Sequence, residues 1–173
     1  MPTTADAVVL FARLDANPLY DRMEEKKAFA LVNSALEVLR SAIRDAGGRV
    51  VKTIGDELLA AFPDAPQAAV AAADMHRHFA PQAFGWPDGS RLTIGFAWGP
   101  VLTQEDGDVF GDTVSIAANA NSGPVRKKPG TIVMNGAALK RLPASVQATC
   151  RLIHTLTIAN RPAIEFYQLP WAP

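Results

Sequence analysis

The chain has 173 residues, of which 49% are hydrophobic and 20% are charged. This length and composition are typical of a soluble globular fold and exclude global disorder, so we expect residues 1–173 to form a single domain. Lys and Arg number 17 and Asp and Glu number 17, so the formal net charge is zero. A balanced surface argues against broad electrostatic binding of nucleic acid or an anionic membrane.

The sequence also predicts a compartment. No apolar run approaches the roughly 18 residues that a membrane-spanning helix needs. The first residues lack the basic start and apolar stretch of a secretory signal. Cys150 is the only cysteine and cannot form an internal disulfide, so we expect a buried, inert thiol. Together these features predict a cytoplasmic protein.

Strands and helices are predicted to alternate along the first half of the chain. Residues 7–14, AVVLFARL, suit a buried central strand, and residues 21–46 follow as a helix that ends at two glycines. The apolar stripe of this helix consists of Phe29, Val32, Leu36, Leu39 and Ile43. Residues 49–54 and 57–62 are predicted to form a β-hairpin with Gly55-Asp56 as its turn.

The second half adds shorter elements. An Ala-rich helix is predicted over residues 66–79, a strand over 91–98 and a second hairpin turn at Asp106-Gly107. The remaining predictions are a helix at 113–121, strands at 131–134, 149–155 and 163–169, and a short helix at 136–142. This order favours an α+β sandwich of the ferredoxin-like kind, with a central antiparallel-rich sheet and helices on one face.

Some side chains have no clear chemical role in the sequence. His76 and His78 lie two residues apart near the end of the Ala-rich helix, so they do not share a face. We expect them to be solvated, or to interact with the C-terminal end of the helix dipole, and not to bind a metal ion. Trp98 is either a core residue or an anchor in an interface. Met75 and Met134 are predicted to fill the core.

Asp56 is the first candidate for chemistry. A carboxylate at a hairpin tip, preceded by Gly, is a reasonable Mg²⁺ ligand, because Mg²⁺ sites often use only one or two carboxylates. The alternative is a turn residue whose side chain binds its own backbone.

Several separated segments resemble the catalytic domain of class III adenylate/guanylate cyclases, and they occur in that family's order. The matching segments are 8–12 (VVLFA), 47–63 (GGRVVKTIGDELLAAFP), 95–101, 106–118 (DGDVFGDTVSIAA), 129–132 and 165–169. The resemblance covers essentially the whole chain. It implies the fold predicted above and a head-to-tail dimer with active sites at the interface. It also implies two aspartates that hold two metal ions on a nucleoside triphosphate.

The resemblance assigns roles to three residues of this sequence. Asp56 matches the second metal-binding aspartate. Lys52 matches the lysine that recognises the purine base, and Asp108 matches its acidic partner.

The other positions depart from the family pattern. Arg13 stands where the first metal-binding aspartate is expected, and Asp15 is the nearest carboxylate that could replace it. The remaining substitutions are Ser115 for the ribose-orienting Asn, Asn119 for the transition-state Arg, Thr93 for a triphosphate-contacting Arg, and Arg161 as the only stand-in for a late Lys.

A guanidinium is always protonated, so Arg13 places positive charge where a cation is expected. We therefore expect Arg13 to form an ion pair with Asp56. The favoured interpretation is a catalytically impaired pseudo-cyclase that acts in regulation or protein interaction, without a cofactor, as a homodimer or heterodimer. One alternative is an active cyclase that uses Mg²⁺ or Mn²⁺ to form a cyclic nucleotide from ATP or GTP. Another is a sensor that holds a purine nucleotide with Lys52 and Asp108.

Overall fold

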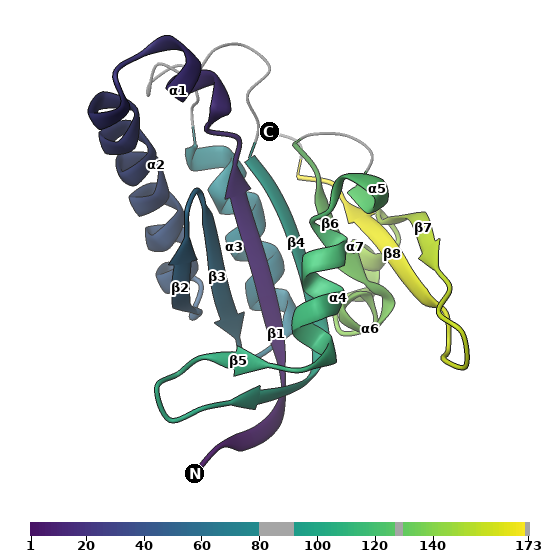
Figure 1. Ribbon diagram of the computed structural model, residues 1–173. Helices are drawn as coiled ribbons and strands as arrows, with labels where there is room; N and C mark the ends of the chain where they lie inside the picture. Colours follow the sequence, from purple (N-terminus) through teal and green to yellow (C-terminus); the bar gives the residue numbers. More distant parts are fainter. Residues whose placement is uncertain (80–91, 127–129, 172–173) are drawn as a thin grey trace.

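An open eight-stranded sheet forms the centre of the computed structural model, which describes residues 1–79, 92–126 and 130–171 (Figure 1). Its strand order is β2-β3-β1-β4-β6-β8-β7, and β5 pairs with β4. The strands are β1 (Thr3–Leu14), β2 (Arg49–Ile54), β3 (Glu57–Phe62), β4 (Leu92–Thr103), β5 (Val109–Phe110), β6 (Ile132–Asn135), β7 (Arg151–Leu156) and β8 (Ile164–Leu169). The helices are α1 (Asn17–Arg22), α2 (Glu25–Asp45), α3 (Ala65–His78), α4 (Asp112–Ala120), α5 (Gly123–Arg126), α6 (Gly136–Leu139) and α7 (Ala144–Gln147).

Strand β1 lies between β3 and β4 and is antiparallel to both. Its pairing with β4 runs from Thr3 opposite Thr103 to Leu14 opposite Leu92. The predicted central strand is confirmed, and it begins four residues earlier than the apolar run. Residues 3–6 are exposed, so they do not belong to a hydrophobic pattern. Their pairing with the long strand β4 extends β1 toward the N-terminus.

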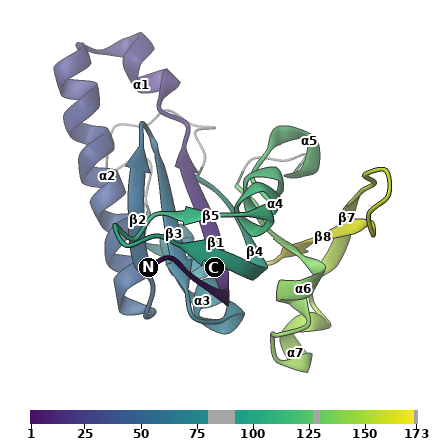
Figure 2. The same cartoon turned by 60° about the horizontal axis from the view of Figure 1, so that its bottom comes forward.

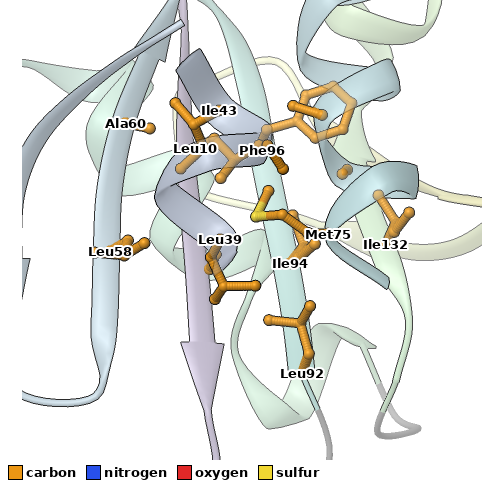
Figure 3. Close-up of a cluster of buried hydrophobic side chains, with 14 of the residues drawn as sticks. Leu10, Leu39, Ile43, Leu58, Ala60, Met75, Leu92, Ile94, Phe96 and Ile132 are labelled. Atoms are coloured by element: carbon orange, nitrogen blue, oxygen red, sulfur yellow. The ribbon is translucent and has the colours of Figure 1, made fainter. Parts of the chain in front are cut away.

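Alternate residues of β1 face opposite sides of the sheet. Val8, Leu10 and Leu14 pack with α2 and α3 in the main core, which Figure 3 shows in part. Val9 and Phe11 pack on the other side, in a smaller cluster that includes Ala117 of α4. The prediction that helices cover one face is therefore wrong, because α4 covers part of the second face (Figure 1).

Two glycines in β4 allow α4 to lie against the sheet. A Cβ on Gly95 would lie 2.5 Å from the backbone nitrogen of Asn121, and a Cβ on Gly99 would lie 2.5 Å from Oγ1 of Thr113. Neither position has room for a side chain. The small, Ala-rich sequence of α4 completes this close approach.

The predicted helix over 21–46 is divided in two. The structure has α1 and α2, separated by Met23 and Glu24, and Pro18 lies in the first turn of α1. Phe29 is wrongly placed in the apolar stripe, because its side chain is 59% exposed. Ala28 is buried instead and continues the stripe of Val32, Leu36, Leu39 and Ile43.

Smaller corrections concern the C-terminal half. The predicted helix over 136–142 ends at Leu139, and α7 follows it as a separate turn of helix. Strand β7 begins at Arg151, so Cys150 precedes it and is half-buried. The predicted start of β4 at Arg91 lies outside the described residues. Met75 and Met134 are fully buried, as predicted.

His76 is not solvated. It is 9% exposed and its ring stacks on Trp171, whereas His78 is exposed, as predicted. The helix stripe that faces the core includes position 76, and Trp171 arrives from a distant part of the chain.

Among the described residues, no helix has both the length and the apolar character needed to cross a membrane.

Candidate functional site

The predicted hairpin turn places Asp56 beside the end of β1. Gly55 adopts a φ of 60°, a left-handed conformation that suits glycine in a tight turn. The carbonyl oxygen of Asp56 accepts a hydrogen bond from the backbone N–H of Leu14 at 3.0 Å. Its Oδ2 accepts one from the backbone N–H of Ala16 at 3.4 Å. The turn and the end of β1 are thus joined through both the backbone and the side chain of Asp56.

Arg13 forms the ion pair that the sequence predicts. Its Nε lies 3.7 Å from Oδ1 of Asp56, and the two side chains are 53% and 27% exposed. Solvent screens such a pair, so its contribution to stability is small. Its importance lies in position, because it puts a guanidinium directly against the carboxylate that the sequence marks as a metal ligand.

Glu57 belongs to the same cluster, and the sequence analysis missed it. It lies opposite Arg13 in the pairing of β1 with β3, so both side chains lie on the α4 face of the sheet. Asn121, just after α4, donates a hydrogen bond from Nδ2 to Oε2 of Glu57 at 3.5 Å. Strand alternation from Leu59 predicts the face of Glu57, but only the packing next to α4 shows that this side chain is half-buried.

Burial raises the pKa of Glu57, while Arg13 and the hydrogen bond from Asn121 act against this rise. Desolvation therefore outweighs the nearby cation. Oδ1 of Asn121 is buried and has no hydrogen-bond partner among the described residues.

Asp15 lies next to this cluster, and its Oδ1 accepts a hydrogen bond from the backbone N–H of Asn17 at 3.3 Å. Within residues 1–79, 92–126 and 130–171, no group of three or more His, Cys, Asp or Glu side chains is arranged to hold a metal ion. The site thus combines one guanidinium with neighbouring carboxylates instead of a set of carboxylate ligands.

Lys52 and Asp108 are brought together from strand β2 and the β4–β5 hairpin. Nζ of Lys52 lies 3.0 Å from Oδ2 of Asp108. The hydrogen bond from Lys52 and a second from the backbone N–H of Val109 lower the pKa of Asp108. Figure 2 shows this hairpin extending across the end of the sheet.

A pocket of about 340 Å³ lies between the β2–β3 hairpin, β5 and the start of α4. Its wall includes Lys52 and Ser115, and its other lining is mostly apolar, with Phe11, Leu59 and Val114 among the residues. A cavity with apolar walls and few polar groups suits a flat heterocycle better than a highly charged group.

The remaining candidate residues divide between the surface and the interior. Ser115 and Asn119 are exposed on α4, and Nδ2 of Asn119 donates to the carbonyl oxygen of Ser115 at 3.1 Å. Thr93 lies opposite Arg13 on β4 and is 4% exposed. Arg161 reaches from the β7–β8 connection to the first residue of α4, where its Nη2 lies 3.0 Å from Oδ2 of Asp112.

No family model matches the chain. The curated proteins that are similar in sequence are nevertheless all adenylate cyclases among those compared. The chain is 39% identical to an adenylate cyclase of Streptomyces coelicolor over 101 residues, which are 58% of this chain and 25% of that protein. It is 35% identical to an adenylate cyclase of Streptomyces griseus over 121 residues, which are 70% of this chain and 28% of that protein. The chain thus spans about a quarter of the length of these relatives.

Solved structures match over nearly the whole chain. A bacterial light-regulated adenylyl cyclase has a TM-score of 0.83 at 21% identity, and the match covers 99% of this chain and 54% of that one. The adenylyl cyclase CyaB from P. aeruginosa has a TM-score of 0.80 at 15% identity, covering 100% and 97%. The adenylate/guanylate cyclase/hydrolase from Silicibacter pomeroyi has a TM-score of 0.78 at 25% identity, covering 98% of both chains.

The fold and the sequence relatives together define the class of protein: a mixed α+β domain of the class III adenylyl and guanylyl cyclase type. The chain is a nucleotide cyclase-like domain, and its curated sequence relatives are adenylate cyclases.

Proposed function

We propose that this chain is a catalytically impaired cyclase domain that acts in regulation through contact with a partner protein. The observation that carries the proposal is the ion pair between Arg13 and Asp56 at the end of β1. In an active domain of this type, the resemblance implies two carboxylates and two metal ions at this place.

The residues present do not fit a pair of divalent cations. Two close cations repel each other, and carboxylate oxygens offset this repulsion. Here Arg13 contributes a permanent positive charge 3.7 Å from Asp56. The guanidinium offsets one of the two negative charges that Asp56 and Glu57 can carry, and burial disfavours the charged form of Glu57, so at most one net negative charge of these three groups is left for two divalent cations.

Catalytic groups implied by the resemblance are also absent from their positions. Ser115, Asn119 and Thr93 occupy places where the family has an Asn and two Arg residues, and Thr93 is buried. Removal of one transition-state donor lowers a rate by about 10²- to 10³-fold. Such losses are not additive. Together, however, they leave the cyclisation reaction with neither metal activation nor stabilisation of the charge that develops in the transition state.

The Arg13→Asp variant tests the metal argument. We expect its affinity for Mn²⁺, measured by calorimetry or electron paramagnetic resonance, to exceed that of the wild type by at least about tenfold, because one repulsive charge becomes an attractive one. Arg13→Ala is the matched control and should fall between the two. Equal Mn²⁺ affinity in all three proteins would contradict the assignment of Arg13 to the metal position.

The enzymatic test uses wild-type protein with ATP or GTP and Mg²⁺ or Mn²⁺. We expect no cyclic nucleotide above the background of a heat-denatured sample. Robust formation of cyclic AMP or cyclic GMP would overturn the proposal and establish an active cyclase.

A second candidate function is purine nucleotide binding. It is favoured by the apolar pocket beside Lys52 and by the contact of Lys52 with Asp108. Among the similar structures, a guanylyl cyclase domain from Catenaria anguillulae was solved in complex with GTP. Titration of the chain with ATP in the absence of metal should give binding heat that Lys52→Ala removes and Lys26→Ala leaves intact. No detectable heat at high micromolar nucleotide would exclude this function.

A further inference from the structure

The C-terminal end of the described chain folds back onto helix α3. Trp171 follows β8 and stacks on His76 with ring centroids 4.4 Å apart and an angle of 6° between the planes. The indole Nε1–H donates a hydrogen bond to the carbonyl oxygen of Gly130 at 3.0 Å, just before β6. Trp171 therefore joins two segments that are distant in sequence. We call residues 170–171 the C-terminal strap.

His76 is the unusual partner in this contact. Its side chain is 9% exposed, and Nε2 is buried without a hydrogen-bond partner among the described residues. Nε2 is thus removed from water without a partner, which favours the neutral imidazole over the imidazolium. Trp171 covers one face of the ring, so removal of the indole is the direct way for water to reach it.

We propose that the strap is a proton-sensitive latch, docked on α3 while His76 is neutral and released when His76 takes up a proton. Release lets the imidazolium reach water, which the docked indole prevents. This device is independent of the proposed function, and its test uses neither nucleotide nor metal.

The charged surroundings of His76 support this inference. Burial lowers the pKa of His76 from 6.5 to about 4, and no charged side chain of the described residues contributes to the shift. On α3, Asp74 and Arg77 pair with each other at 3.0 Å, and His78 is exposed. No carboxylate among these residues compensates a proton on His76.

The difference between the pKa of His76 in the docked state and its ordinary value gives the direction and size of the pH dependence of docking. The folded pKa lies below the ordinary value, so the docked state is fully favoured above pH 6.5 and loses stability as the pH falls toward 4. If release restores the ordinary pKa, the docking equilibrium constant falls about twentyfold between pH 7 and pH 5.

The test measures the pKa of His76 by NMR in the wild type and in Trp171→Ala. We expect a value far below 6.5 in the wild type and a rise toward 6.5 in Trp171→Ala. Trp171→Phe, which keeps a stacked ring, should retain the low pKa, and His78 should titrate alike in all three proteins. Amide spectra would verify that each variant is folded.

A second measurement follows Trp171 itself in the wild-type protein. Protein labelled with 5-fluorotryptophan reports Trp171 through a ¹⁹F resonance, assigned by its loss in Trp171→Phe. We expect this resonance to shift between pH 7 and pH 5 in the wild type and to stay constant in His76→Phe. An ordinary pKa for His76, an unchanged pKa in folded Trp171→Ala, or equal ¹⁹F titration in His76→Phe would each overturn the latch.

Discussion

At the scale of single residues, Arg13 is accommodated in β1 by the carboxylates around it. Its neighbours on β1 remain buried and paired in register with β3 and β4. Its side chain lies beside Asp56 and opposite Glu57, so its positive charge has two carboxylates as neighbours. The fold therefore accommodates a guanidinium at the end of β1 without loss of strand pairing.

Glu57 provides a test of this balance at the level of one residue. Its pKa is raised by burial, so its charged form is disfavoured in the folded state. The corresponding stability is present below the ordinary pKa and is lost as the pH rises through the folded pKa. We expect Glu57→Gln to have a higher free energy of unfolding than the wild type at pH 7, and a smaller difference at pH 4, by urea titration.

Glu37 is the matched control for this prediction. Hydrogen bonds from Arg44 and Arg40 lower its pKa at the exposed surface of α2, which is the opposite direction. Glu37→Gln should leave stability at pH 7 unchanged or slightly reduced. If Glu57→Gln were instead destabilising at pH 7, the interaction with Arg13 would outweigh the burial of the carboxylate.

At the level of elements, the contact between α4 and β4 decides where the candidate residues lie. Helix α4 lies close to the sheet at Gly95 and Gly99. This close packing brings Ser115, Asn119 and Asn121 to the face of the sheet that carries Arg13. The same contact encloses Glu57 and raises its pKa. A helix on this face was not predicted, since small residues in α4 give a weak amphipathic pattern.

Gly95→Ala tests the close approach of α4. The new Cβ would lie 2.5 Å from the backbone nitrogen of Asn121 and 2.8 Å from the carbonyl carbon of Ala120, so backbone must move. We expect a loss of about 1–3 kcal/mol in the free energy of unfolding, typical of overpacking.

Gly123→Ala is the control for that variant, because nothing lies within 4 Å of the added Cβ. Its stability should stay within about 0.5 kcal/mol of the wild type. Equal effects of both substitutions would show that α4 does not depend on the glycine at position 95.

At the scale of the whole molecule, the β4–β5 hairpin exposes apolar side chains to solvent. Leu102 and Phe110 are 36% and 43% exposed on the β4–β5 hairpin. They border a groove of about 780 Å³ whose lining also includes Trp98, Pro100 and Ile116. Trp98 is half-buried, so it both packs against the main core and lines this groove. The guanidinium of Arg141 lies 3.9 Å from the centre of the Trp98 ring. Exposed patches of this kind often mark interaction sites.

We expect this face to contact a second cyclase-type domain, either another copy of the chain or a related one. Sedimentation of the wild type should show a dimer at micromolar concentration if copies associate, and Phe110→Glu should weaken that dimer by at least about tenfold. Val70→Glu changes a more exposed apolar residue on α3 that does not line the groove, and it should have no effect. A monomeric wild type would direct the search to a different partner protein.

Local patterns determined much of this protein. The buried run of β1, the Gly55-Asp56 turn and the Ala-rich α3 all lie where the sequence predicts them, because each depends on residues adjacent in the chain. The family resemblance and the pairing of Arg13 with Asp56 were also accessible, since a hairpin turn brings its tip to the end of a neighbouring strand. Only the tertiary structure decided that α4 covers the second face, that Glu57 is enclosed and that His76 is buried under Trp171. Those features depend on contacts between distant segments, where the environment of a side chain is set by what packs against it and not by its own neighbours in sequence.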